Sequence, residues 1–64
     1  MPYVVKETKR GKLDNYLCVR RMVGYDWTRD PSSAFRFDTY EAAERAVESF
    51  PGLPLTIQAV YFGP

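Results

Sequence analysis

The sequence contains no histidine and a single cysteine among its 64 residues. Histidine is the commonest general base and metal ligand near neutral pH, so its absence argues against the usual acid–base and metal chemistry. Cys18 has no second cysteine for an intrachain disulfide, and its β-prone surroundings predict a buried structural thiol. The glycines Gly11 and Gly24 are isolated and form no phosphate-binding loop. We therefore predict that the protein is not an enzyme and holds no metal ion or cofactor.

Long apolar runs are also missing. No segment approaches the roughly 20 apolar residues that cross a bilayer, and residues 1–6 lack the basic region and apolar core of a signal peptide. A lone cysteine fits a reducing compartment better than a small secreted scaffold. We expect a cytoplasmic protein with no membrane partner, folded as a single domain over residues 1–64, and either a monomer or a homodimer.

Charge is small overall but unevenly distributed. The net charge is +1, yet residues 1–21 carry six basic against two acidic side chains, and residues 22–64 carry three basic against six acidic ones. The basic residues of the first predicted hairpin are Lys6, Lys9, Arg10 and Lys12. With the rings of Tyr3 and Tyr16 nearby, this hairpin is a candidate nucleic-acid-binding surface. The alternative is a charged hairpin tip that protects an edge strand from aggregation.

Alternating β-prone residues and one helical pattern define the predicted elements. Strands are expected at 3–7, 16–23 and 55–62, with a turn at Gly11 and a loop over 29–33. Gly24 either ends the second strand or marks a bulge before Tyr25. A helix is expected over 39–49, because alanines recur on one face and Pro51 and Gly52 follow it.

The start of this helix has a clear capping pattern. Asp38 is the expected N-cap, and Glu41, three residues on, would complete a capping box with it. Phe37 just before the cap is expected to lie in the core. Small alanines on the buried face would let the helix lie close to a sheet.

These elements predict an α+β fold of ββαβ order, with a three-stranded, mainly antiparallel sheet and one helix packed on one face. A single helix covers one face only, so the other face is left to solvent, to a dimer partner or to another binding partner.

Aromatic residues gather around the predicted loop, and Trp27 is either part of the core or an exposed contact. Because aromatic and arginine side chains dominate binding energy at interfaces, we predict a set of candidate partner contacts: Tyr3, Arg20, Arg21, Tyr25 and Trp27.

A motif of about 17 residues combines Trp27 and Thr28 with Ala34-x-x-Phe37-Asp38-Thr39-x-Glu41-x-Ala43. This pattern resembles very short proteins encoded by phages and prophages, most of which have no assigned activity. The resemblance implies a non-enzymatic accessory protein that binds a host protein, including inhibition of host defence systems such as CRISPR effectors. The alternatives are a small nucleic-acid-binding protein and a structural, dimeric accessory protein.

Overall fold

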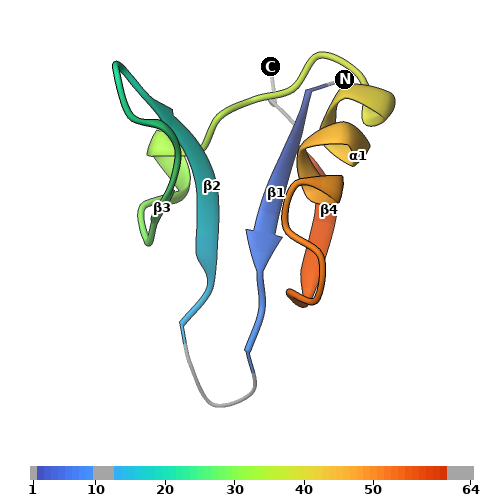
Figure 1. Ribbon diagram of the computed structural model, residues 1–64, viewed down its shortest axis with the longest axis horizontal. Helices are drawn as coiled ribbons and strands as arrows, with labels where there is room; N and C mark the ends of the chain where they lie inside the picture. The colour runs from blue at the N-terminus through green and yellow to red at the C-terminus, as the bar shows by residue number, and fades with distance from the viewer. Residues whose placement is uncertain (1, 10–12, 61–64) are drawn as a thin grey trace.

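A computed structural model of the chain describes residues 2–9 and 13–60. Over these residues the chain forms a four-stranded antiparallel sheet with one α-helix on one face (Figure 1). The elements in chain order are β1 (Tyr3–Glu7), β2 (Asn15–Arg20), β3 (Gly24–Thr28), the 3-10 helix η1 (Pro31–Ser33), α1 (Tyr40–Glu48) and β4 (Leu55–Ala59). The predicted α+β class is confirmed. The predicted strand number of three is wrong, because a further strand, β3, follows β2.

The additional strand arises because β2 and β3 form a tight hairpin, whereas the β-prone sequence predicted one continuous strand here. Residues 21–23, predicted as part of a strand, form its turn, in which the Val23 N–H donates to the Arg20 carbonyl over 3.2 Å. Met22 adopts a φ of 68° and Gly24 a φ of 92°. Only the glycine is suited to this left-handed region, and Arg, Met and Val are not typical turn residues. Gly24 therefore opens a new strand and marks neither a strand end nor a bulge.

The strands follow the order β3-β2-β1-β4, and the central pair separates at one end. β1 pairs with β4 along its full length, from Tyr3 opposite Ala59 to Glu7 opposite Leu55. In contrast, β1 pairs with β2 only at its end, where Lys6 and Glu7 lie opposite Tyr16 and Asn15. The two strands thus splay apart towards the start of β1, as Figure 1 shows.

The segment after η1 fills the space between the splayed strands. The N–H and C=O of Phe37 exchange two hydrogen bonds of 2.8 Å with Tyr3 of β1. Two residues earlier, the Phe35 N–H donates to the Leu17 carbonyl of β2 over 3.0 Å. This segment thus pairs three backbone groups at the splay, namely the N–H and C=O of Tyr3 and the C=O of Leu17.

The core lies between the sheet and α1. Its buried members are Val5, Leu17, Phe37, Ala43 and Ala46, of which Val5, Leu17 and Ala43 have no exposed surface. The sheet residues come from the odd-numbered positions of the strands, which share one face. The alanines let α1 lie close to the sheet, as predicted, and the expectation that Phe37 is buried is confirmed.

The helix begins one residue later than predicted and with a different cap. Thr39 is the N-cap, and its Oγ1 accepts a hydrogen bond from the Ala42 N–H over 3.1 Å. The predicted Asp38 cap is therefore wrong, and the predicted capping box with Glu41 does not form, since Glu41 lies in the second position of the first turn. Aspartate and threonine are both preferred at N-caps, with aspartate ranked higher, so residue preference alone does not select Thr39.

The other face of the sheet is partly covered by the chain itself, so the expectation of an uncovered face is wrong in part. Val4 and Cys18, on even-numbered positions, are each only 5% exposed, which confirms the buried thiol. A cleft of about 350 Å³ remains on this side. It is lined by Val4, Tyr16, Pro31, Arg36, Gln58, Ala59 and Val60.

Candidate functional site

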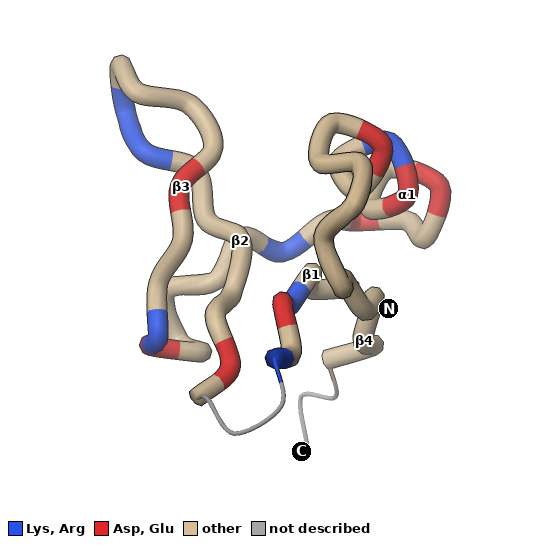
Figure 2. The backbone as a smooth tube through the Cα atoms, turned by 60° about the horizontal axis from the view of Figure 1, so that its bottom comes forward, with Lys and Arg blue, Asp and Glu red and all other residues tan. Residues whose placement is uncertain are grey.

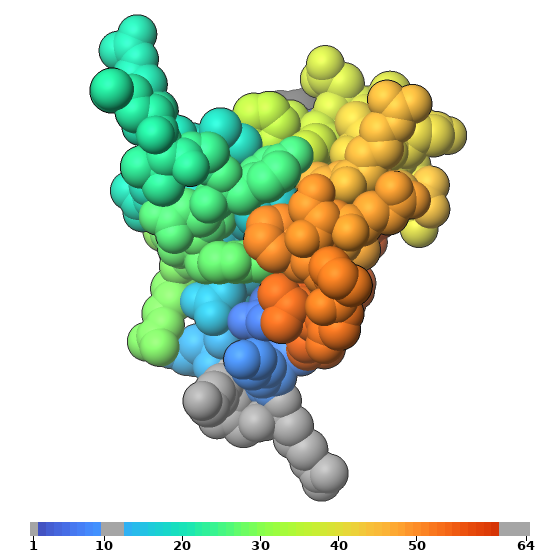
Figure 3. Space-filling view, viewed as in Figure 1, coloured from blue at the N-terminus to red at the C-terminus, as the bar shows by residue number. Residues whose placement is uncertain are grey.

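The strongest candidate surface is the end of the β2–β3 hairpin, which we call the hairpin tip. It consists of four apolar residues and two arginines: Val19, Met22, Val23, Tyr25, Arg20 and Arg21. The space-filling view shows this end of the hairpin projecting beyond the rest of the molecule (Figure 3). Met22 is fully exposed and Val23 is 70% exposed. The hairpin tip is therefore the most prominent apolar projection on the described part of the chain.

The exposure of the hairpin tip follows from the strand register and the helix position. Val19 and Tyr25 lie opposite each other on β2 and β3, on the face that also carries the core. They lie beyond the area that α1 covers, so both are about half exposed. Four of the eight exposed large hydrophobic residues in the described chain belong to the hairpin tip. Scattered apolar residues are normal on surfaces, whereas a concentration on a projection is typical of an interaction site.

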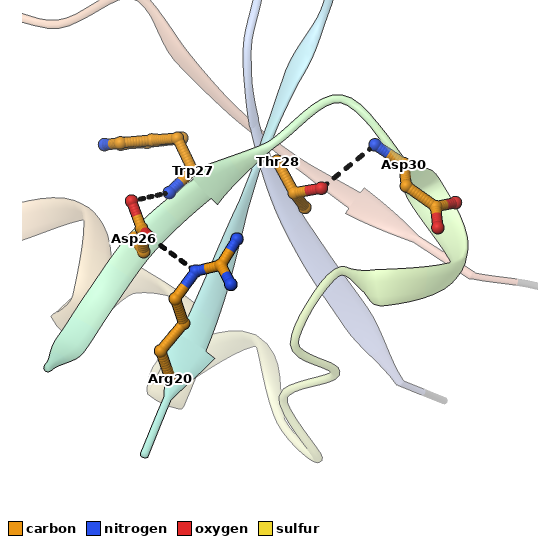
Figure 4. Close-up of polar contacts among 5 residues, drawn as sticks. All are labelled: Arg20, Asp26, Trp27, Thr28 and Asp30. Atoms are coloured by element: carbon orange, nitrogen blue, oxygen red, sulfur yellow. Dashed lines mark hydrogen bonds and ion pairs between the residues drawn. The ribbon is translucent and has the colours of Figure 1, made fainter. Parts of the chain in front are cut away.

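A polar network on β2 and β3 supports the base of the hairpin tip (Figure 4). The Arg20 Nε donates to one Asp26 carboxylate oxygen. The other carboxylate oxygen of Asp26 accepts from the Trp27 backbone N–H over 2.8 Å. This backbone hydrogen bond lowers the pKa of Asp26 below its ordinary value, and Arg20 lowers it further. The carboxylate therefore stays charged and keeps Arg20 aligned along the hairpin.

A second network holds the turn that follows β3. The Asp30 N–H donates to the Thr28 Oγ1 over 3.1 Å. The Asp30 carboxylate accepts from the Ser32 hydroxyl, the Ser32 N–H and the Ser33 hydroxyl, over 2.7 to 3.0 Å. These hydrogen bonds lower the pKa of Asp30. The chain direction after the hairpin is thus fixed by side-chain capping of η1.

Aromatic stacking joins the hairpin to the helix end. The ring of Phe50, just after α1, packs edge-on against Trp27 at a centroid distance of 5.3 Å and against Tyr25 at 5.8 Å. Trp27 is half-buried in this cluster and packs against the core, and its role as a partner contact stays a prediction. Tyr25 belongs both to this aromatic cluster and to the hairpin tip, because its ring contacts Phe50 and the residue remains 45% exposed.

The structure brings three of the five predicted partner contacts together. Arg20, Arg21 and Tyr25 share the hairpin tip. Tyr3 lies apart, half-buried beside the core, with its ring edge-on to Tyr40 at 5.7 Å. Sequence reasoning missed three apolar members of the hairpin tip, Val19, Met22 and Val23, which it assigned to a strand. The available signal was the length of the β-prone run up to Gly24, which leaves room for a strand and a turn.

The predicted basic hairpin is only partly within the described residues. Lys6 lies 3.7 Å from the Asp14 carboxylate, and Lys9 lies 3.8 Å from that of Glu7. Arg10 and Lys12 lie outside the described residues. Figure 2 shows basic and acidic positions interspersed along this part of β1 and β2. Because each described lysine has a carboxylate nearby, the positive field there is weakened, and nucleic-acid binding stays a prediction.

Comparisons with known proteins leave the hairpin tip to be interpreted from its own chemistry. Searches of protein-family models, curated proteins and solved structures find no match to this chain. Within residues 2–9 and 13–60, His, Cys, Asp and Glu side chains form no group of three or more that could hold a metal ion. In the same part of the chain, the helix is too short to cross a membrane.

Proposed function

We propose that this protein is a non-enzymatic binding protein that uses the hairpin tip to occupy a surface on another protein. The observation that carries the proposal is the exposure of Met22, Val23, Val19 and Tyr25 together on one projection. Each apolar side chain of this size gains about 1.5–3 kcal/mol when it is fully buried. A complementary groove that buries two or three of them would contribute several kcal/mol to binding, against an association cost of about 4–15 kcal/mol.

The chemistry of the hairpin tip also suits a protein partner. Tyr25 and Arg21 are of the residue types that most often anchor interfaces. Arg21 lies in the turn and Arg20 is paired with Asp26, so a cation flanks the apolar side chains. A partner with an apolar groove bordered by carboxylates would match this arrangement. Because Phe50 and the Asp26 network hold the hairpin in place, less conformational freedom is lost on binding.

The resemblance to short phage and prophage proteins supports a more specific form of the proposal. In this form the partner is a protein of a bacterial host, reached in the host cytoplasm. The protein would bind it stoichiometrically and could act as an inhibitor, in the manner of proteins that block CRISPR effectors. The hairpin tip would then cover a functional surface of that host protein.

The test is capture from bacterial lysate with a matched pair of variants. Wild-type protein, Val23→Ser and Leu13→Ser would each be immobilised and the captured proteins identified by mass spectrometry. Val23 and Leu13 are 70% and 71% exposed, so neither substitution disturbs the core, but Leu13 lies outside the hairpin tip. We expect wild type and Leu13→Ser to capture the same protein and Val23→Ser to lose it.

Titration of the purified pair would then give the size of the effect. The Val23→Ser variant should bind at least about tenfold more weakly, which is about 1.4 kcal/mol. The proposal fails if no protein is captured above background. It also fails if both serine variants bind as tightly as the wild type.

A further inference from the structure

The two edges of the sheet differ in how their backbone groups are used. β3 forms one edge and β4 the other. At the β3 edge, Asp26 binds the Trp27 N–H and places a carboxylate beside the strand. Charged side chains and occupied N–H groups are devices that keep edge strands from pairing with other chains. The Asp26 carboxylate and the occupied Trp27 N–H therefore protect part of the β3 edge.

The backbone groups that β4 directs outwards can be assigned from its neighbours. Tyr3 uses its N–H and C=O on the side away from β4, towards Phe37, and the Val60 N–H donates to the Pro2 carbonyl over 2.8 Å. Because backbone groups alternate between the two sides of a strand, the even-numbered residues of β4 pair with β1. The odd-numbered ones, Leu55, Ile57 and Ala59, direct their N–H and C=O groups to the outside.

The β4 edge differs from the β3 edge because it has no charged side chain, although one of its outward N–H groups is also occupied. Its residues Leu55–Ala59 include no charge and no proline. The Leu55 N–H is taken by the Leu53 carbonyl over 2.9 Å. Within the described chain, the outward groups of Ile57 and Ala59 have no partner. They form an open hydrogen-bonding edge that another strand could join.

The outward N–H and C=O groups of one β4 strand can pair with the same groups of a second, antiparallel β4 strand. We propose that two copies of the protein pair antiparallel through β4, with the two-fold axis at Ile57. The two Ile57 residues would exchange reciprocal N–H···O bonds, and each Ala59 N–H would donate to the carbonyl of the partner's Leu55. The Leu55 N–H, already bonded to Leu53, needs no partner in this register. The result is a continuous eight-stranded sheet, twice the four strands of one protomer.

The side chains of β4 fit the same register. Thr56 would lie directly opposite the partner's Gln58, in a pair of the closely spaced type. Both side chains are exposed and uncharged, so no repulsion opposes the contact. Because β3 is at the opposite edge from β4, the two hairpin tips would lie at the two far ends of the sheet. If the proposed function holds, the dimer would present them bivalently.

The experiment is sedimentation velocity in reducing buffer, from micromolar to millimolar protein, for the wild type and two double variants. The wild-type mass should rise with concentration from 7.4 kDa towards twice that value. The first variant carries Thr56→Glu and Gln58→Glu, which places carboxylates opposite each other across the proposed interface. The second carries Thr56→Glu and Gln58→Lys, which places opposite charges there. Position 56 lies opposite Lys6 within the protomer, so glutamate is compatible with the fold.

We expect the first variant to weaken dimerisation at least about tenfold and the second to restore it to the wild-type level or beyond. Circular dichroism would verify that both variants are folded. A wild-type protein that stays at 7.4 kDa at every concentration overturns the proposal. So does a dimer that both variants leave unchanged, because it would use another surface. Neither result bears on capture through the hairpin tip, which uses different residues.

Discussion

The aromatic cluster at Phe50 offers the sharpest test of how the hairpin is held. Phe50 follows α1 and contacts both Tyr25 and Trp27, so it is the ring that connects the helix to β3. Substituting Phe50→Ala should therefore destabilise the fold and loosen the hairpin at once. The matched variant Phe50→Leu keeps most of the apolar surface but removes both ring contacts.

The expected loss of unfolding free energy follows from the partial burial of Phe50 and from its two ring contacts. Replacing a fully buried phenylalanine by alanine costs about 3–5 kcal/mol, so the half-buried Phe50 should lose about 2 kcal/mol. Each aromatic pair adds about 0.5–1.5 kcal/mol beyond its area. The expected loss is about 3–5 kcal/mol for Phe50→Ala and about 1–3 kcal/mol for Phe50→Leu. A domain of 64 residues has a total stability of about 3–10 kcal/mol, so the alanine variant should be close to unfolding.

Urea unfolding followed by circular dichroism and by fluorescence of the single tryptophan, Trp27, measures these free energies. With a slope of about 1 kcal/mol per molar urea, Phe50→Ala should lower the midpoint by about 3 M or more. The control is Phe35→Ala, which removes a 41% exposed ring with one ring partner, Phe37 at 4.8 Å. A loss below about 1 kcal/mol at Phe50, or an equal loss at Phe35, would refute the reasoning.

Two further predictions concern the helix cap and the acidic side chains. Thr39→Ala should lower the unfolding free energy by about 1 kcal/mol because the Ala42 N–H loses its acceptor. Asp38→Ala should change the unfolding free energy little. An equal effect of the two substitutions in urea titrations would contradict the cap assignment. The pKa values of Asp26 and Asp30 are lowered in the folded state, so both carboxylates stabilise the fold above their ordinary pKa values. That stabilisation should be lost as the pH falls through the lowered folded values, and the stability of Asp26→Asn or Asp30→Asn should depend less on acid pH than that of the wild type.

The sequence predicted the elements whose signals are local and repeated. β1 was predicted with its observed bounds, α1 within one residue at each end, and β4 with its observed start, because apolar periodicity and proline stops define them. The predicted turn at Gly11 and residues 61–62 of the predicted last strand lie outside the described residues. The β2–β3 turn was missed because Met22 adopts a left-handed conformation that no sequence rule assigns to methionine. Register between strands, and hence the separation of Tyr3 from the hairpin tip, depends on long-range packing that a single sequence does not encode locally.

The splayed β1–β2 pair connects the fold to the proposed function. Because the segment containing Phe35 and Phe37 takes the place of further β1–β2 pairing, the far end of β2 leaves the main sheet and carries β3 with it. Among the described residues, this end of β2 pairs with β3, whose Tyr25 packs against Phe50. The hairpin tip can therefore project without removing any residue from the core formed by Val5 and Leu17. A fully paired β1–β2 ladder would have kept Val19 beside β1 and reduced the apolar surface available to a partner.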